Sequence, residues 1–260
     1  MRKTIELPAP ELSQLKRVDI DLDMTGRHYA LLATSEGNIP EELALSILKD
    51  LVVQDANKLT LAELRYLFML VKINAMDNNY NAYVYCTHFN PKTKKDCNYK
   101  NEVQIRLSDA DLNRTPHGYK VPEIEFVIDN TQQMYKVMPP TADMEISLLN
   151  YLIVEKGIPQ IDLQKDKTTA LKFSFIRAMM HLVNDKGERV ISQVNQFDEC
   201  EKLFDVNKYT TIRKLFSLME EVDGFGVQEE HVYHFKCKEC GGELVFTIPL
   251  LYGFSNSVQL

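Results

Sequence analysis

The chain has 260 residues, 45% of them hydrophobic, and its 37 acidic and 30 basic side chains give a net charge of −7. This length and composition allow a sizeable core, as one large domain or as a helical body with a β appendage. No apolar run approaches the ~20 residues that span a bilayer, and the first six residues do not resemble a signal peptide. A soluble intracellular protein is therefore expected, and the acidic balance disfavours nucleic-acid binding.

Residues 1–36 are predicted to form an extended N-terminal segment. Residues 7–10 contain two prolines, and residues 18–22 alternate apolar and acidic side chains as a half-buried strand does. The segment is therefore expected to contribute strand structure ahead of the first helices.

Residues 37–112 are predicted to contain two helices and the first cysteine pair. Pro40, followed by Glu41 and Glu42, is typical of a helix start, and that helix should continue to about Val53. Thr60 with Glu63 forms a capping box. The second helix should then bury one face, formed by Leu61, Leu64, Phe68 and Val71.

Cys86 and Cys97 lie between two strand-like runs, residues 80–85 and 102–107, which alternate with a period of two. The gap between these cysteines is longer than the usual spacing of metal ligands, and His88 is an alternative ligand within it. Four lysines surround the pair and are interpreted as part of a solvated loop: Lys92, Lys94, Lys95 and Lys100.

Residues 113–228 are predicted to form a strand pair and a helical bundle. Alternation indicates strands at residues 124–128 and 135–137. Thr141 is expected to cap a helix that ends near Gly157. Further helices are expected over residues 169–184, 198–204 and 210–222.

Residues 229–260 repeat the cysteine arrangement. Cys237 and Cys240 lie between strand-like runs at residues 231–235 and 243–248, and two glycines follow Cys240. Two hairpins that each supply two thiolates would form the tetrahedral sulfur site that structural zinc prefers. Because 139 residues separate Cys97 from Cys237, a shared zinc ion would close a long loop and is expected to stabilise the whole fold.

The predicted fold class is therefore α+β, with a central helical region flanked by two β-hairpins that together form a zinc-ribbon-like module. The predicted ligands are Cys86, Cys97, Cys237 and Cys240, and residues 229–260 should form one compact unit with residues 37–112. The alternative is that Cys86 and Cys97 are ordinary strand-end residues and that Cys237 and Cys240 bind nothing. Cys200 has acidic neighbours and is interpreted as a buried, inert thiol.

No catalytic residues are predicted. A redox Cys-x-x-Cys motif ordinarily opens a helix, whereas Gly241, Gly242 and a strand follow Cys240. A site filled by four thiolates also leaves no open coordination position for a catalytic zinc ion.

Several stretches, in the same order, resemble the baseplate hub assembly family of T-even-like contractile-tail phages. The resemblance extends over residues 43–254 and is carried by residues 59–73, 81–86, 135–141, 235–242 and 247–249. It implies a non-enzymatic structural or assembly component of the tail baseplate, with other baseplate or hub proteins as partners and with homo- or hetero-oligomers expected. It also implies action in the host cytoplasm during assembly, after which the protein either stays in the virion tail baseplate or leaves as a chaperone.

The C-terminal residues are a candidate contact with such partners. Leu251, Tyr252 and Phe254 lie in an apolar segment that could occupy a groove, or pack on its own domain. The alternative function is a zinc-ribbon adaptor of a transcription or nucleic-acid-associated complex, whose binding would weaken steeply with salt.

Overall fold

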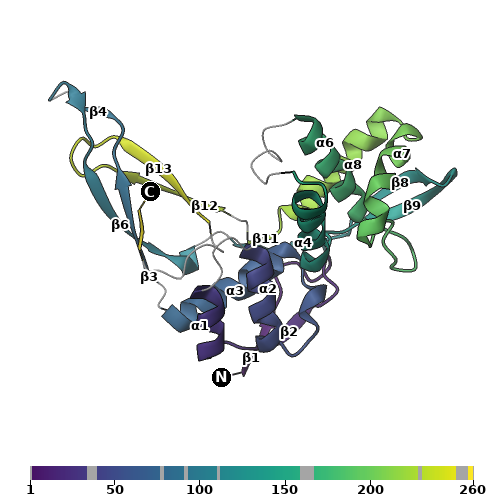
Figure 1. Ribbon diagram of the computed structural model, residues 1–260, viewed down its shortest axis with the longest axis horizontal. Helices are drawn as coiled ribbons and strands as arrows, with labels where there is room; N and C mark the ends of the chain where they lie inside the picture. The colour runs from purple at the N-terminus through teal and green to yellow at the C-terminus, as the bar shows by residue number, and fades with distance from the viewer. Residues whose placement is uncertain are drawn as a thin grey trace.

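The computed structural model has two lobes and a projecting arm (Figure 1). It describes residues 2–33, 40–76, 79–90, 93–109, 112–158, 167–227, 230–249 and 257–259. The N-terminal lobe and the helical lobe lie side by side, and the arm extends away from both. Mixed helix and sheet confirm the α+β class. Among the described helices, none has the length and apolar character needed to cross a bilayer.

The N-terminal lobe packs two helices against a β-ribbon. Strands β1 (Arg2–Glu6) and β2 (Arg17–Asp21) pair antiparallel, and Val18 and Ile20 of β2 are fully buried. The predicted alternation in this region is confirmed, because the acidic residues of β2 face away from the core. The remaining elements of the lobe are α1 (Gly26–Ala33), α2 (Pro40–Leu51), η1 (Ala56–Lys58) and α3 (Leu61–Met76).

Helix α1 lies in the segment that was expected to be extended through residue 36, so that expectation was wrong for residues 26–33. Its Leu31 and Leu32 pack against the core of the N-terminal lobe, and His28 is almost completely buried. The helix therefore owes its position to tertiary packing, which local strand signals do not report.

Helices α2 and α3 were predicted and are confirmed. The capping box of α3 is complete, since Thr60 N–H donates to Glu63 Oε2 at 2.9 Å and Glu63 N–H donates to Thr60 Oγ1 at 3.3 Å. Leu64, Phe68 and Val71 are buried on one face of α3. This face forms the centre of the lobe.

The helical lobe surrounds a three-stranded sheet of order β10-β9-β8. Strands β8 (Glu123–Ile128) and β9 (Thr131–Val137) confirm the predicted strand pair. Thr141 caps the next helix by accepting a hydrogen bond from Met144 N–H at 3.4 Å. The other elements are α4 (Ala142–Asn150), the π-helical η3 (Tyr151–Glu155), α6 (Lys167–Met180), β10 (Leu182–Val183), η4 (Val194–Glu199), α7 (Cys200–Asp205) and α8 (Tyr209–Asp223).

Helix α6 ends at Met180, four residues before its predicted end. Leu182 and Val183 leave the helix and pair with Val137 and Lys136 of β9. The apolar residues at 182 and 183 continue the helical pattern in sequence, but the exposed edge of β9 offers them a hydrogen-bonded partner.

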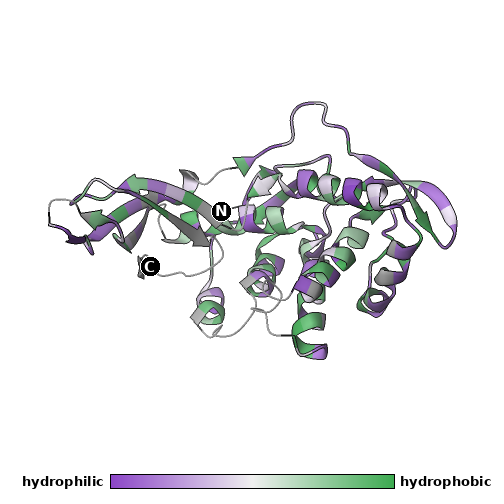
Figure 2. Ribbon diagram, turned by 90° about the horizontal axis from the view of Figure 1, so that it is seen from above, coloured by the Kyte–Doolittle hydropathy of each residue, from purple (hydrophilic) through white to green (hydrophobic). Residues whose placement is uncertain are grey.

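The arm consists of two long hairpins and the last strand. Figure 2 shows hydrophobic and hydrophilic residues alternating along its strands, as expected when each hairpin buries one face. Strands β7 (Leu112–Asn113) and β11 (Gly226–Val227) pair with each other near α3. The arm comprises β3 (Asn79–Tyr85), β4 (Phe89–Asn90), β5 (Lys95–Asp96), β6 (Lys100–Arg106), followed by the single turn η2 (Leu107–Asp109), then β12 (Glu230–Lys236), β13 (Glu243–Pro249) and β14 (Ser257–Gln259).

Among the described residues, twenty form a second buried core that lies mainly in the helical lobe and includes Ala9 and Leu12 of the N-terminal segment. The core of the arm is much smaller and comprises Cys86, Cys237 and Leu244, with Phe235 and two further cysteines packed against it. The division of the chain at residues 36, 112 and 228 stays a prediction.

Candidate metal centre

The first hairpin presents Cys86 and Cys97 at the end of the β3–β6 ladder. Cys86 follows β3 directly, and Cys97 follows the short strand β5. The residues between them fold back as the two-stranded ribbon β4–β5, which pairs Phe89 with Asp96. The long gap therefore forms a small projection, and its ends return to within hydrogen-bonding distance of each other: Cys97 N–H donates to His88 O at 2.8 Å.

The second hairpin presents Cys237 and Cys240 in the turn between β12 and β13, with the same backbone pattern. Gly241 N–H donates to Cys237 O at 2.9 Å, just as Asn98 N–H donates to Cys86 O at 2.9 Å. Gly241 and Asn98 both have left-handed φ angles, +74° and +49°. The two arms are therefore equivalent in geometry although their cysteine spacings differ, and the left-handed position accounts for glycine or asparagine after each second cysteine.

The four sulfur atoms form one compact cluster. Cys86 Sγ lies 3.5 Å from Cys240 Sγ, and Cys97 Sγ lies 3.8 Å from Cys237 Sγ. All four lie within 4.8 Å of one another, and none forms a disulfide. Zinc–sulfur bonds of 2.3 Å in a regular tetrahedron place sulfur atoms about 3.8 Å apart. The two shortest of these contacts are close to that spacing, and the four cysteines together could bind a metal ion.

Each sulfur atom also accepts a hydrogen bond from the backbone N–H two residues further along. For Cys240 the donor is Gly242 N–H, at 3.4 Å. The same relation joins Cys86 to His88, Cys97 to Tyr99 and Cys237 to Glu239. Such N–H groups stabilise negative charge on sulfur, which four metal-bound thiolates would carry.

Asn101 connects the two hairpins at the cluster and is completely buried. Its Nδ2 donates to Cys237 Sγ at 3.5 Å and to Tyr99 O at 3.2 Å, and its Oδ1 accepts from Lys238 N–H at 3.0 Å. An amide is suited to this position because it can donate to one hairpin and accept from the other at the same time. Asn101 was not predicted as a site residue, because an asparagine within a strand carries no local signal for this role.

The thiols of Cys86, Cys97 and Cys237 differ in the direction of their pKa shifts. Burial raises the pKa of Cys86 to about 12, and burial also raises the pKa of Cys97. Burial acts in the same direction on Cys237, but hydrogen bonds from the backbone and from Asn101 outweigh it and lower its pKa to about 6. A bound divalent cation would favour the ionised form of the thiols that hold it, and binding would release protons.

His88, the predicted alternative ligand, lies beside the cluster. Its Nδ1 is 3.6 Å from Cys86 Sγ, and its ring lies over Gly242. A Cβ atom added at Gly242 would come within 2.8 Å of this ring, which explains the glycine there. Substitution of a cysteine ligand by His88 stays a prediction.

Cys200 lies outside the cluster and is a buried thiol, as predicted. It is fully buried in the helical lobe, where burial, and next the negative charges of Asp198 and Glu199, raise the pKa of its thiol to about 12. The candidate partner residues Leu251, Tyr252 and Phe254 lie outside the described residues.

Comparison with protein-family models matches residues 22–254 to the family described as T4 bacteriophage base plate protein. The chain belongs to this family of baseplate proteins. The resemblance noted in the sequence is thereby confirmed, and with it a structural role in the phage tail baseplate. Neither curated proteins nor solved structures give a match.

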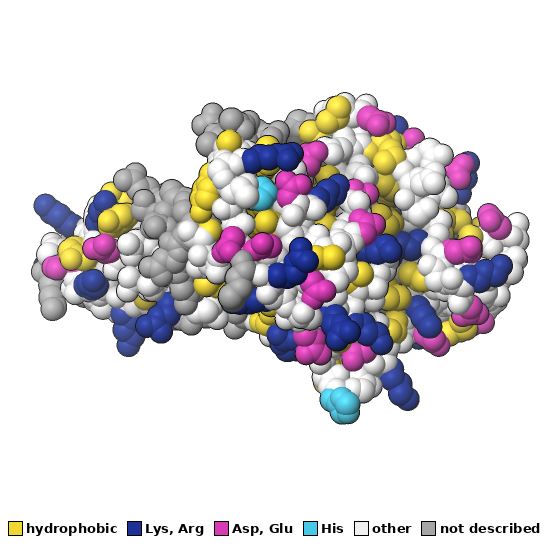
Figure 3. All heavy atoms as spheres, turned by 90° about the horizontal axis from the view of Figure 1, so that it is seen from below, with side chains coloured by type: hydrophobic (Ala, Val, Ile, Leu, Met, Phe, Trp, Pro, Cys, Tyr) yellow, Lys and Arg dark blue, Asp and Glu magenta, His cyan; other side chains and the backbone are white. Residues whose placement is uncertain are grey.

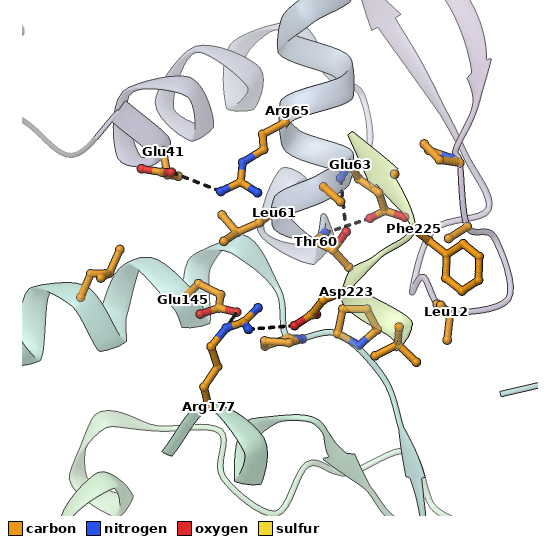
Figure 4. A pocket seen from close by; sticks show the side chains of 18 of the residues that line it. Leu12, Glu41, Thr60, Leu61, Glu63, Arg65, Glu145, Arg177, Asp223 and Phe225 are labelled. Atoms are coloured by element: carbon orange, nitrogen blue, oxygen red, sulfur yellow. Dashed lines mark hydrogen bonds and ion pairs between the residues drawn. The ribbon is translucent and has the colours of Figure 1, made fainter. Parts of the chain in front are cut away.

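A pocket between the two lobes of this baseplate protein was not predicted (Figure 4). Its volume is about 430 Å³, and its wall includes charged groups from both lobes. Arg177 Nε lies 2.6 Å from Glu145 Oε1 and its Nη1 lies 2.8 Å from Asp223 Oδ2, while Arg65 faces Glu41 at 3.5 Å. These charged groups form ion pairs with one another, and the pocket is therefore a structural part of the junction between the lobes.

Proposed function

We propose that this baseplate protein is non-enzymatic, that it acts by docking to other baseplate or hub proteins, and that a zinc ion bound by four cysteines holds its arm in shape. The observation that carries the proposal is the close approach of the sulfur atoms of Cys86, Cys97, Cys237 and Cys240, which all lie within 4.8 Å of one another. These residues would hold the ion, and zinc would supply cross-linking and charge neutralisation.

The small core of the arm supports a structural role for the ion. Among the described residues of the arm, the hydrophobic cluster has three buried members, and two of them are candidate ligands. Apolar burial in this cluster alone therefore provides little stability. The helical lobe, in contrast, has a full core of its own. Zinc is therefore expected to stabilise the arm and to hold together the two ends of the intervening chain. We propose this effect on the arm in place of an effect on the whole fold.

The chemistry of the cluster supports a role without catalysis. Four thiolates complete the coordination of a zinc ion and leave no position for water or substrate. The turn after Cys240 leads into β13, so no helix N-terminus activates the Cys-x-x-Cys pair for redox exchange.

Elemental analysis tests the metal. We expect one zinc ion per chain in the parent protein, and loss of zinc after Cys237→Ser or Cys240→Ser. Cys200→Ser is the matched control, because Cys200 is also buried but lies in the other core; it should retain zinc. Retention of stoichiometric zinc by both cluster variants, or its absence from the parent protein, would refute the site.

Docking through the C-terminal tail is tested by a truncation after Pro249, which removes Leu251, Tyr252 and Phe254. We expect the truncated protein to co-purify less with hub proteins than the full chain does. The comparison uses both host cytoplasm during assembly and purified virions. Unchanged co-purification would remove the tail from the proposal. Steeply salt-dependent binding to DNA by the intact protein would instead favour the nucleic-acid adaptor function.

A further inference from the structure

The first hairpin carries several exposed aromatic side chains. Tyr85, Phe89 and Tyr99 are 48%, 61% and 40% exposed. Val84 and Asn101 pair with each other and are buried, whereas Tyr85 and Lys100, the next pair of the ladder, are exposed on its other face. The exposed aromatics therefore contribute little to the core of the arm, and clusters of this kind mark contact surfaces in soluble proteins.

The same hairpin is basic in an acidic protein. Residues 79–106 contain five basic and two acidic side chains, a net charge of +3, whereas the rest of the chain carries −10. Lys94 and Lys95 are exposed next to the β4–β5 ribbon that bears Phe89. Lys100 Nζ lies 4.0 Å from the ring centre of Tyr83. Figure 3 shows lysine and arginine side chains together with hydrophobic ones at the end of the molecule where the arm lies.

The neighbouring hairpin argues against nucleic acid as the partner. Residues 230–249 contain three acidic and two basic side chains, so the basic surface is a short patch at the tip of one hairpin. A phosphate backbone requires a longer basic track. An aromatic patch with a few lysines is typical of a contact with an acidic protein surface.

We propose that the tip of the first hairpin docks on the acidic lobes of a second copy of this chain. The charge of −10 outside the hairpin supplies the complement in every copy. Such a contact joins different surfaces on the two partners, so it is repeated from copy to copy and builds a ring or an open chain. The inference rests on the proposed docking function and specifies its partner.

Sedimentation velocity of the full chain, at about 0.05 M and about 0.5 M salt, tests the contact. The parent protein should exceed its monomer mass of 30.0 kDa at low salt and approach it at high salt. The variant Phe89→Ser/Lys94→Glu/Lys95→Glu should lower the association constant at least about tenfold. The control Tyr209→Ser/Lys186→Glu/Lys202→Glu makes the same changes on the acidic helical lobe, so its added negative charge should leave association at least as strong as in the parent protein.

Zinc content separates misfolding from loss of contact. If the triple arm variant loses zinc, Phe89→Ser alone replaces it, with Tyr209→Ser as its control. A parent protein that stays monomeric at about 100 μM, or equal effects of the arm and control variants, overturns the inference. Salt-sensitive binding of single-stranded DNA that requires the arm residues also overturns it. A monomeric parent that still co-purifies with hub proteins leaves the proposed docking function intact.

Discussion

The side-chain amide of Asn101 lies 3.5 Å from Cys237 Sγ, although 135 residues separate the two in sequence. Asn101 belongs to β6 and Cys237 to the turn after β12, so this contact fastens the two hairpins of the arm. The same amide accepts a hydrogen bond from Lys238 N–H. The Asn101 side chain therefore positions one candidate ligand, Cys237, together with the turn that contains it.

Replacing Asn101 by Ala should destabilise the arm by about 2 kcal/mol, because buried donors and acceptors on both hairpins lose their partner. Zinc affinity should fall about tenfold or more through loss of the contact to Cys237. Competition with a chelator measures the affinity, and thermal denaturation measures the stability. Gln104→Ala changes an exposed residue of the same strand and serves as control. Equal zinc affinities for the two variants would contradict the positioning role.

Removal of zinc should unfold the arm and leave the lobes folded. The helical lobe and the N-terminal lobe each have a large core without cysteine ligands, so the far-UV circular dichroism signal of the helices should be largely retained after chelation. Limited proteolysis should then cleave within residues 79–106 and 230–249. Concerted loss of the helical signal with zinc would show that the ion supports the entire fold.

Glu63 should make stability depend on pH. Burial, only partly offset by hydrogen bonds from Ser13 and Thr60, raises the pKa of Glu63 from 4.5 to about 7, so the folded protein holds this proton more tightly than the unfolded chain does. The resulting penalty is absent below pH 4.5, grows as pH rises to about 7 and is complete above it. Glu63→Gln keeps an oxygen for Thr60 N–H and should stabilise the protein by about 1–3 kcal/mol at pH 8.

That gain should disappear as the pH approaches 4.5, as measured by urea unfolding across the range. Glu125→Gln is the control, since Glu125 lies on the exposed face of β8. If the gain in stability at pH 8 persists unchanged at pH 4.5, its cause is not the buried charge of Glu63.

Among the basic residues at the junction of the lobes, Arg177 should be the one whose substitution lowers the stability of the protein most. Its guanidinium contacts Glu145 at 2.6 Å and Asp223 at 2.8 Å. Arg177→Met leaves two carboxylates without this cation and should cost about 3–5 kcal/mol. Arg213→Met, on the exposed face of α8, should cost less than about 1 kcal/mol. Chemical denaturation compares them, and similar losses would contradict a structural role for the Arg177 ion pairs.

Local patterns in the sequence were sufficient to predict much of the secondary structure. The capping box at Thr60 and Glu63, the alternation around Val18 and the strand pair β8–β9 are each set by neighbours in sequence, through hydrogen bonds within a turn or a period of two. The order of short motifs was also enough to recognise the baseplate family.

Only the tertiary structure decided what these elements do together. It ends α6 at Met180 because β9 offers Leu182 a strand partner, and it makes the two unequal cysteine turns equivalent by folding β4–β5 outward. It places Asn101 between the hairpins and Arg177 between two carboxylates. These relationships join residues far apart in the chain, and their energies come from burial and contacts that no local sequence pattern contains.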